Sequence, residues 1–555
     1  MLTIRQLQVD YGGQMALKIS QPVSFQRGDR IGIIGSNGAG KTTLVKAVLG
    51  LIPYQGRIVT ELRPEQMAAH MQSNAYVNTM PVKYIMEMIL GTRISRNEKL
   101  KQLIDFFDFA SCLSKKYSAL SGGQKQKFTI IMVMLQEAEL TFYDEVTSGL
   151  DFETRQRLME RLVEWYADRE DTLVIVSHYY EELELLADKL LILDQGHVIA
   201  YGSREELFQE YCGNAIVIVE NSRRNRGLTE GFPVLEAPGH LLALSRQDRA
   251  RRWRRIFYPY WWNTISISRE AIRISRSCPS MPYENFTENR RRGRMMKKKF
   301  CVPMIWYELR NLNGNLMCHF FGVVFPNLMS LLISKASCAQ VPADLRPQIT
   351  TSVMLSMSLV MPMATMFLGY GALYSQEVEQ GVPLRMHLFG IRENSLMLAK
   401  IAAHFILFTV EILIFAVFHI LVMDVQKPAV PSLVCLLVSL YAVALIFLVL
   451  SHAIANIFCK FSYTFGIEMS LYFILMVLTG MIGVRTEQLP ELLQKIAKTL
   501  PMTYISNDFV DFWQGGQYNF MPFIQAFVFM GAAAGIILLF SLWKSGRFQQ
   551  SRITG

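Results

Sequence analysis

Six long apolar stretches in the second half of this 555-residue chain limit its fold more than any other feature. Each stretch is near or above the ~20 residues that a helix needs to cross the hydrocarbon core of a bilayer. A soluble helix bundle would need polar faces, which these stretches lack. We therefore predict an all-α membrane domain with six spans. The predicted spans are 316–333, 352–374, 396–423, 431–457, 465–484 and 520–543.

Lysine and arginine are distributed unevenly around these spans. Six crossings place both ends of the membrane domain on one side, where we count 15 Lys and Arg against 6 on the other side. Cytosolic loops are enriched in positive residues, so the N-terminal part should lie in the cytosol. The chain also starts without the basic-then-apolar run of a secretion signal. We expect a multi-pass protein of a bacterial cell membrane, surrounded by the lipid bilayer.

The net charge of +10 is concentrated in one segment. Residues 214–300 contain 19 Lys and Arg and 7 Asp and Glu, a net charge of +12, which leaves −2 for the rest of the chain. A basic balance spread over the whole chain would suggest a nucleic-acid partner. This distribution does not, so we expect no nucleic acid. None of the eight cysteines has the spacing of a metal clamp or a redox pair.

The basic segment differs from its surroundings because the periodicity of helices and strands is lost in it. Arginines precede a cluster of aromatic residues there: Arg251, Arg252, Trp253, Arg254 and Arg255, then Phe257, Tyr258, Tyr260, Trp261 and Trp262. Arginines beside aromatic rings suit the lipid headgroup layer. A solvated basic tether would have the same composition. Both interpretations stay open.

The N-terminal part alternates short apolar runs with helix-like stretches. The runs at 30–35, 140–144 and 173–177 are typical of strands buried on both faces of an α/β sheet. A turn at Asp194, Gln195 and Gly196 predicts a hairpin that closes this domain. We divide the chain into an α/β domain at 1–212, a basic aromatic linker or small module at 213–300, and the six-span domain at 301–555.

A glycine-rich loop follows the run at 30–35 and opens a helix. It contains Gly35, Asn37, Gly38, Gly40, Lys41, Thr42 and Thr43. Glycines let the backbone wrap a phosphate chain with its N–H groups pointing inward, and the helix N-terminus favours negative charge. Lys41 would reach the β- and γ-phosphates of ATP, and Thr42 would offer its hydroxyl to Mg²⁺. The expected fold is therefore an α/β P-loop NTPase domain followed by the all-α six-span domain.

The run at 140–144 ends in two carboxylates, Asp144 and Glu145. Asp144 can hold the metal through its water shell, and Glu145 can polarise the attacking water as a general base. A strand that ends in Asp-Glu is a weak signal by itself. Behind a phosphate loop, in this order, it indicates a nucleotide hydrolase.

A third motif, Ser121, Gly122, Gly123 and Gln124, lies between the phosphate loop and the carboxylate pair. Together the three motifs closely resemble the ATP-binding cassette (ABC) family, over the whole first domain. The resemblance implies that the Ser-Gly-Gly turn caps the γ-phosphate bound by an opposite subunit, using exposed N–H groups at a helix start. It therefore implies a second copy of the chain, or a similar half-transporter, as partner.

Further positions match this family one by one. The resemblance implies that Tyr11 stacks on adenine, that Gln72 contacts the metal and the water, and that His178 senses the γ-phosphate. It also implies a dimer-contact loop from Ser148 to Asp151. Taken alone, Tyr11 could be a turn aromatic, Gln72 a surface amide and His178 a satisfied strand-end histidine.

One position departs from the family pattern. Where the family usually has proline after the glutamate, this chain has Val146. Proline there only stiffens a loop, so the departure concerns loop geometry more than chemistry.

The membrane domain carries looser resemblances and two open questions. Segments 376–385 and 490–501 resemble an acidic cytosolic loop and the loop before the last span of type-2 ABC permeases. In the third span, His404, Glu411 and His419 fall on one face of a helix. They form either a substrate or proton pathway or a structural hydrogen-bonded cluster. The second span is rich in methionine, which suits an adaptable wall for ligands or ordinary helix packing.

The combined resemblance implies an ATP-driven transporter of an unidentified substrate, with ATP and Mg²⁺ as cofactors. ATP binding would clamp two cassettes together, and hydrolysis at Glu145 would reset them. Export is expected because the permease resemblance is to an exporter-rich class. The alternative is a non-transporting ATP-dependent membrane sensor or assembly factor of the same architecture. A soluble cassette ATPase acting on nucleic acid would require the apolar stretches to be core helices.

Overall fold

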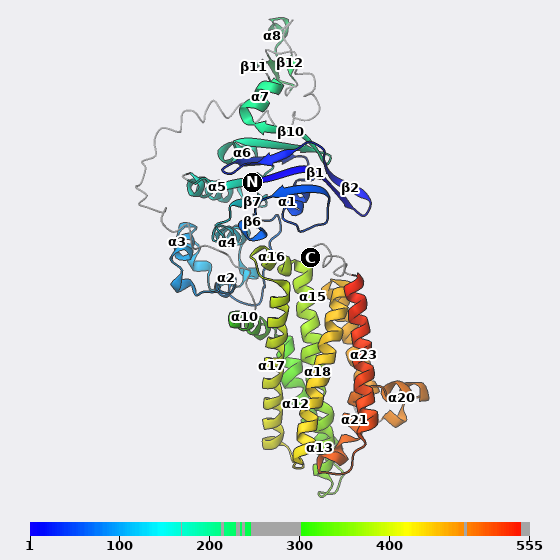
Figure 1. The fold of residues 1–555 in the computed structure, drawn as a ribbon. Helices are drawn as coiled ribbons and strands as arrows, with labels where there is room; N and C mark the ends of the chain where they lie inside the picture. The colour runs from blue at the N-terminus through cyan, green and yellow to red at the C-terminus, as the bar shows by residue number, and fades with distance from the viewer. Residues whose placement is uncertain are drawn as a thin grey trace.

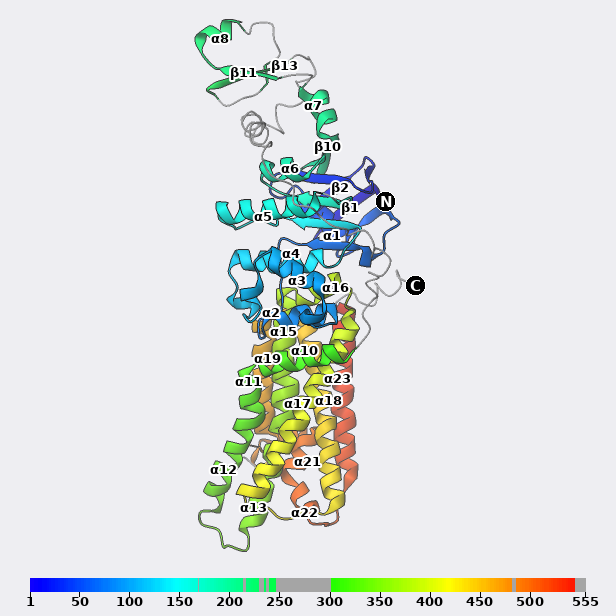
Figure 2. The same cartoon turned by 90° about the vertical axis from the view of Figure 1, so that its left-hand side faces the viewer.

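The computed structural model places an α/β part on one end of a long bundle of helices (Figure 1, Figure 2). It describes residues 1–167, 169–212, 216–228, 234–235, 239–245, 301–481 and 486–544. The predicted basic and aromatic segment at 251–262 lies outside the described residues.

A ten-stranded sheet forms the centre of the α/β part. Its parallel strands are the short runs of β-branched and aromatic residues that the sequence suggests; all five residues of β7 and all five of β8 are buried. The order is β3-β1-β2-β10-β9-β4-β8-β7-β6, and β5 also pairs with β1. The strands are β1 Leu2–Tyr11, β2 Gln14–Ile19, β3 Val23–Phe25, β4 Arg30–Gly35, β5 Gln55–Thr60, β6 Met67–His70, β7 Leu140–Asp144, β8 Thr172–Val176, β9 Lys189–Asp194 and β10 His197–Ser203.

Helices complete this part and bring their apolar faces to the sheet. In α5, for example, Leu158, Met159 and Leu162 are buried at helical spacing, while charged residues cover the other face. The predicted hairpin is confirmed: β9 and β10 pair antiparallel, and Gln195 and Gly196 both have positive φ. The helices are α1 Lys41–Val48, α2 Val82–Leu90, α3 Glu98–Phe106, α4 Gly122–Met134, α5 Phe152–Tyr166, α6 Tyr180–Leu186 and α7 Arg204–Cys212.

A small sheet follows α7 at the end of the molecule farthest from the helical bundle (Figure 2). Its order is β11-β13-β12, and the strands are Ile216–Glu220, Leu241–Ser245 and Val234–Leu235. The short helix α8, Arg223–Leu228, lies between β11 and β12 in the chain.

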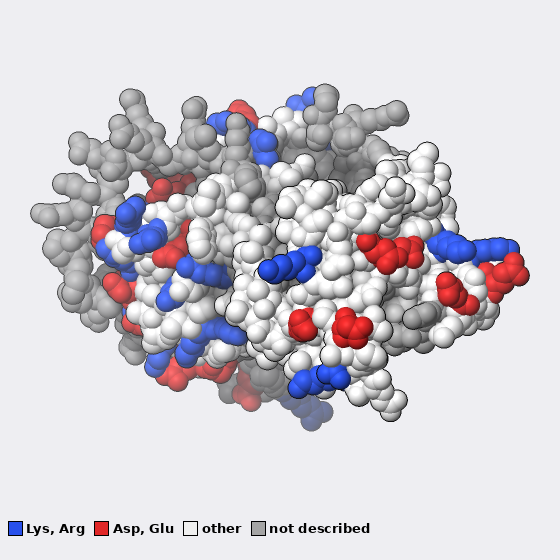
Figure 3. Space-filling model, turned by 90° about the horizontal axis from the view of Figure 1, so that it is seen from below, with Lys and Arg blue, Asp and Glu red and all other residues white. Residues whose placement is uncertain are grey.

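Within the part of the chain that the structure describes, six helices of the bundle are long and apolar enough to cross a membrane, as predicted. Large apolar side chains such as Leu413, Ile420 and Val438 are exposed on them, as expected for surfaces that face lipid. The end of the molecule away from the sheet shows mostly uncharged surface (Figure 3). The spans are Phe320–Cys338, Arg346–Gln380, Glu393–Val422 (α17), Val430–Phe458 (α18), Phe461–Leu478 (α19) and Phe520–Lys544 (α23).

Shorter helices connect and cap the spans. The second span contains the π-helical turn Met363–Gly369 (η8) and continues as α15, Tyr370–Gln380. Gly381, with φ 81°, ends α15 and lets α16, Val382–Leu388, turn toward the α/β part. Helix α10, Val302–Asn313, also lies at this junction (Figure 1, Figure 2). At the other end lie α20 Glu491–Ala497, α21 Pro501–Asn507 and α22 Phe509–Trp513.

Candidate nucleotide site and its contacts with the helical bundle

The phosphate loop connects β4 to α1, where the sequence predicts it. Gly38 and Gly40 have φ values of 81° and 92°, a region in which other residues are strained. A Cβ atom on Gly40 would lie 2.9 Å from the carbonyl oxygen of Ala16 in β2. Glycine is therefore required at Gly40 both by its own backbone and by the neighbouring strand.

Lys41 lies in the mouth of this loop. Its Nζ donates hydrogen bonds to the carbonyl oxygens of Gly35, at 2.8 Å, and Ser36, at 3.0 Å. Burial lowers the pKa of Lys41, while the nearby Glu145 and Asp144 carboxylates act in the opposite direction. The ammonium group is thus held at the loop, where it could exchange carbonyl oxygens for phosphate oxygens. Asn37 and Gly38 are exposed at the tip, and Thr42 and Thr43 are partly buried in the first turn of α1.

Asp144 fits the role of a metal ligand. Its side chain is fully buried at the end of β7, and neither carboxylate oxygen has a hydrogen-bond partner among the described residues. Burial raises the pKa of Asp144 to about 6. A buried carboxylate with free lone pairs beside the Thr42 hydroxyl offers the hard oxygen donors that Mg²⁺ prefers, and Gln72, which contacts the adjacent Glu145, could add its amide oxygen.

Glu145 is held between two other side chains that the sequence singles out. Gln72 Nε2 donates a 2.9 Å hydrogen bond to Glu145 Oε2, and His178 Nε2 lies 2.8 Å from Glu145 Oε1. The three residues come from the segment after β6, the end of β7 and the end of β8, which are neighbouring parallel strands. Carboxyl ends of parallel strands meet at one edge of a sheet, which explains why residues so far apart in sequence meet here.

The backbone at Glu145 turns sharply away from β7. Its φ is 51°, which is rare for a residue other than glycine and is typical of strained functional positions. The next residue, Val146, is buried in the core under the helices, and Ser148 N donates to the carbonyl oxygen of Glu145. The valine that departs from the family pattern therefore contributes apolar packing.

The Ser121 turn starts α4. Ser121 Oγ accepts a hydrogen bond from Gln124 N, and Gln124 Oε1 accepts one from Ser121 N, which is a capping box. Ser121 and Gly122 are exposed, and Gly123 packs near Thr154. No hydrogen bond or ion pair within the described part of the chain joins this turn to the phosphate loop.

Tyr11 and Asp151 are the outlying members of the predicted set. Tyr11 ends β1 at the tip of the β1–β2 hairpin and is 49% exposed. Asp151 caps α5 by accepting a 3.0 Å hydrogen bond from Thr154 N, and this hydrogen bond lowers the pKa of the carboxyl. Both side chains are therefore at the surface, available to a ligand or a second subunit.

The segment between β6 and α2 links this site to the helical bundle. Gln72 lies near its start, while Thr79 Oγ1 near its end donates a 2.6 Å hydrogen bond to Asn311 Oδ1 of α10. In the middle, the hydroxyl of Tyr76 accepts a 2.9 Å hydrogen bond from Arg385 Nε of α16. Arg385 is buried and also donates to the carbonyl oxygen of Ala69, so α16 is anchored on both sides of Gln72.

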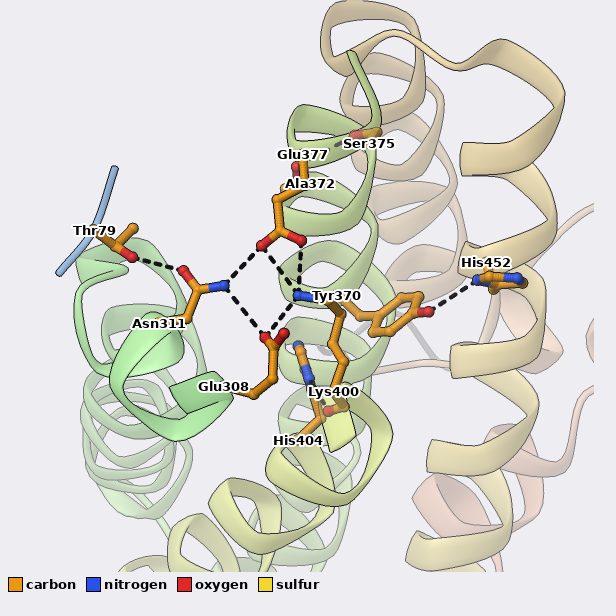
Figure 4. Close-up of polar contacts among 10 residues, drawn as sticks. All are labelled: Thr79, Glu308, Asn311, Tyr370, Ala372, Ser375, Glu377, Lys400, His404 and His452. Atoms are coloured by element: carbon orange, nitrogen blue, oxygen red, sulfur yellow. Dashed lines mark hydrogen bonds and ion pairs between the residues drawn. The ribbon is translucent and has the colours of Figure 1, made fainter. Parts of the chain in front are cut away.

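Asn311 belongs to a buried ion cluster where α10, α15 and α17 meet (Figure 4). Lys400 Nζ lies 2.7 Å from Glu308 Oε2 and 3.0 Å from Glu377 Oε2. Asn311 Nδ2 donates to Glu377 Oε1 at 2.7 Å. Thr79 of the cassette is thus connected through the side-chain amide of Asn311 to Glu377, near the end of the second span. Glu377 in turn pairs with Lys400, near the start of the third span.

The predicted stripe of the third span is buried. Glu411 Oε2 accepts a 2.6 Å hydrogen bond from Thr365 in η8. His404 Nδ1 and His419 Nδ1 each lie 2.8 Å from the carbonyl oxygen four residues earlier in α17. The stripe begins one turn earlier than predicted, at Lys400, whose carbonyl oxygen lies against His404 Nδ1. Its spacing of four residues from His404 was the signal that could have shown this.

The methionines of the second span pack inside the domain. All five are buried and belong to its main apolar cluster together with Phe367 and Tyr370. This agrees with the packing interpretation of the two that the sequence left open. The five are Met354, Met357, Met361, Met363 and Met366.

Two protein families match the chain in consecutive regions. The family described as ABC transporter matches residues 21–148, which include the phosphate loop, the Ser121 turn and the Asp144–Glu145 pair. The family described as ABC-2 type transporter matches residues 303–512, which include the first five spans.

Three curated relatives of the chain are named as ATP-binding proteins. The linearmycin resistance ATP-binding protein LnrL of Bacillus subtilis is 26% identical over 42% of this chain and 78% of its own length. The Nod factor export ATP-binding protein I of Bradyrhizobium diazoefficiens is 30% identical, over 35% of this chain and 68% of its own. The molybdate/tungstate import ATP-binding protein WtpC of Thermococcus kodakarensis is 27% identical over 39% and 71%. A solved ATP binding subunit of an ABC transporter aligns with a TM-score of 0.34, at 24% identity, over 38% of this chain and 92% of that one.

Proposed function

The chain belongs to the ABC transporter family, as an ATP-hydrolysing cassette fused to an ABC-2 type membrane domain, and on this premise we propose that it exports a solute. Two copies, or one copy and a similar half-transporter, would pair so that the Ser121 turn of one cassette closes on the phosphate loop of the other. The exposed capping box at Ser121 supports this arrangement, since its N–H groups and hydroxyl are available to a phosphate.

The proposal rests mainly on the segment from Gln72 to Thr79, which contacts both the nucleotide site and the membrane domain. Gln72 bonds to Glu145 in the nucleotide site, and Thr79 bonds to Asn311 in the membrane domain. A shift of Gln72 on closure of the site would be passed to α10 and, through Arg385, to α16. ATP binding could in this way rearrange the spans.

We assign the residues of the site the following roles. Thr42, Asp144 and Gln72 would hold Mg²⁺, which when bound neutralises phosphate charge. Glu145 would accept the proton of the attacking water, and Gln72 and His178 keep its carboxylate oriented. Lys41 would contact the β- and γ-phosphates, and the exposed ring of Tyr11 would stack on adenine.

Direction and topology belong to the same proposal. Relatives named for resistance and export support export; another is named for import, so direction is what the experiment has to test. We place the cassette, residues 1–212, in the cytosol and the 301–555 domain in a bacterial cell membrane, with 213–300 as a linker or small module between them. The excess of Lys and Arg on the cassette side supports this orientation.

The test uses vesicles in which the cassettes face outward and ATP with Mg²⁺ is added outside. A screen of labelled small solutes should find at least one that accumulates inside, and Glu145→Gln should abolish this accumulation. Hydrolysis that moves none of the solutes would favour the membrane sensor or assembly factor instead. Accumulation that persists in Glu145→Gln would contradict the proposed mechanism.

The shared site has its own test. Lys41→Ala and Ser121→Arg should each be inactive alone. In a mixed dimer one site contains both substitutions and the other contains neither, so co-assembly should restore hydrolysis. No recovery in a purified mixed dimer would show that the Ser121 turn acts within its own chain.

A further inference from the structure

The fifth span carries a buried polar stripe that the ATP-driven mechanism does not use. Thr464, Glu468 and Tyr472 follow one another at four-residue spacing in α19, and all three are buried. Thr464 Oγ1, Glu468 Oε2 and the Tyr472 hydroxyl have no hydrogen-bond partner among the described residues. Three such atoms on one helix face are unusual inside a membrane domain, where each unsatisfied polar group is costly.

Glu468 is the carboxylic acid of this stripe, and no cation of the described residues pairs with it. Its carboxylate rests on the backbone of the second span: a Cβ atom on Gly371 would lie 2.0 and 2.2 Å from its two oxygens. None of the described lysines or arginines forms an ion pair with it. An isolated ionised carboxylate is far more costly to bury than a neutral one.

The helices that pack against α19 also place no cationic group of the described residues beside Glu468. Helix α15 contributes only phenols and acids, α18 contributes His452, and η8 contributes none. His452 Nδ1 lies 2.9 Å from the hydroxyl of Tyr370 (Figure 4). Helix α20, with its exposed Lys495, follows the opposite end of α19. The groups on α15 and α19 are Tyr370, Tyr374, Glu377, Glu379, Tyr463 and Tyr472.

The two contacts of Ser451 link its single hydroxyl proton to the protonation state of Glu468. Ser451 Oγ lies 2.9 Å from the carbonyl oxygen of Phe367 and 2.7 Å from Glu468 Oε1. A serine hydroxyl has one proton, and a carbonyl oxygen can only accept. If Ser451 donates to Phe367, the second contact needs a proton on Glu468. Phe367 lies in the π-helical turn η8, an irregularity that is common at functional sites.

We propose that Glu468 is a proton-binding site, protonated in this conformation and in exchange with the cassette end of the membrane domain. Helix α19 starts at that end, where Phe461 N donates to Glu379. Glu468 lies seven residues further on, about 10 Å along the helix, and Thr464 lies between on the same face. Asn456 Nδ2, unpartnered among the described residues, adds a donor on α18 near that end.

Release of the proton would change the contacts between spans. The proton would leave Glu468 Oε1 for water and turn this oxygen into an acceptor. The single proton of Ser451 would then be drawn to the carboxylate, and the Ser451–Phe367 hydrogen bond would break. Proton binding is in this way linked to the contact between α18 and the π-helical turn of the second span, which goes beyond the proposed ATP-driven export.

Infrared spectroscopy of the full-length protein in lipid nanodiscs, without nucleotide, tests the proposal separately from transport. The wild type at neutral pH should show the C=O stretch of a protonated carboxylic acid, and Glu468→Gln should lose it. Glu411→Gln, which changes another buried glutamate of the spans, should keep this component and serves as the matched control. In D₂O the band should shift, because the proton exchanges.

Three outcomes would overturn the proposal. The first is that Glu468→Gln keeps the acid band and loses an ionised-carboxylate band, which would mean that Glu468 is ionised in the wild type. The second is an acid band that does not shift in D₂O, which contradicts exchange. The third is a carboxylate signal that moves on titration with Na⁺, which assigns the site to a metal cation. If Glu468→Gln fails to fold, Ser451→Ala decides: the acid band should change frequency, and an unchanged band refutes the proposal.

Discussion

Replacing Lys400 with methionine should strongly destabilise the membrane domain. Lys400 is buried between Glu308 and Glu377, which are buried as well. Methionine keeps the apolar stem and removes the ammonium group, so two carboxylates are left without their cation. Removing one partner of a buried ion pair typically costs about 3–5 kcal/mol. At roughly 2–4 °C per kcal/mol for a domain of this size, the midpoint of thermal unfolding should fall by about 6–20 °C.

The control for this substitution is a variant in which the whole cluster is neutral. Lys400→Met combined with Glu308→Gln and Glu377→Gln retains similar volumes and removes the uncompensated charge. Replacement of a buried ion cluster by neutral groups is often nearly neutral for stability, so most of the loss should be recovered. Tryptophan fluorescence during thermal unfolding in nanodiscs measures all variants alike. The reasoning is refuted if Lys400→Met melts within about 2 °C of the wild type, or if the triple variant melts below the single one.

Three further predictions concern the cassette. Glu145→Gln should still bind a fluorescent ATP analogue but hydrolyse ATP at least ~10²-fold more slowly, and unchanged turnover would remove Glu145 from the role of general base. Gly40→Ala should lower ATP affinity because the new Cβ meets the carbonyl oxygen of Ala16 at 2.9 Å; Gly50→Ala, with φ 68° but open space, is the control and should bind normally. Burial raises the pKa of Glu182, so as the pH rises the folded cassette releases this proton at a higher pH than the unfolded chain does. The stability of the wild-type cassette should therefore fall relative to that of Glu182→Gln as the pH rises above 4.5. Equal melting differences between wild type and Glu182→Gln at pH 4.5 and pH 7.5 would contradict this.

Much of the nucleotide site could be predicted because its motifs are local. Gly38, Gly40 and Lys41 lie in one loop, and their spacing alone indicates a phosphate cradle. Gln72 and His178 could be named only through the family resemblance, because no local pattern connects them to Glu145. Their hydrogen bonds to Glu145 follow from the order of parallel strands β6, β7 and β8, which is a property of the sheet.

The contacts between the cassette and the membrane domain could not be predicted either, because they too depend on the tertiary structure. Arg385 ends the segment that the sequence predicts as a cytosolic loop, yet its side chain is buried in the cassette against Tyr76. Thr79 and Asn311 carry no sequence signal that would mark them as partners. Whether a polar residue faces solvent or another domain depends on docking, which composition and periodicity do not encode.

Features that depend on neighbours in the chain could be predicted from the sequence: a phosphate-binding loop, a strand ending in two carboxylates, and six segments apolar enough to enter a bilayer. Backbone conformation and the transfer of apolar residues out of water act over a few residues or along one helix. Which polar groups meet inside the membrane domain depends on the packing of its helices. Lys400 and Glu308 are 92 residues apart, and Ser451 and Glu468 lie on different helices. The rotation of each helix about its axis, which sequence leaves open and packing selects, brings such groups into contact.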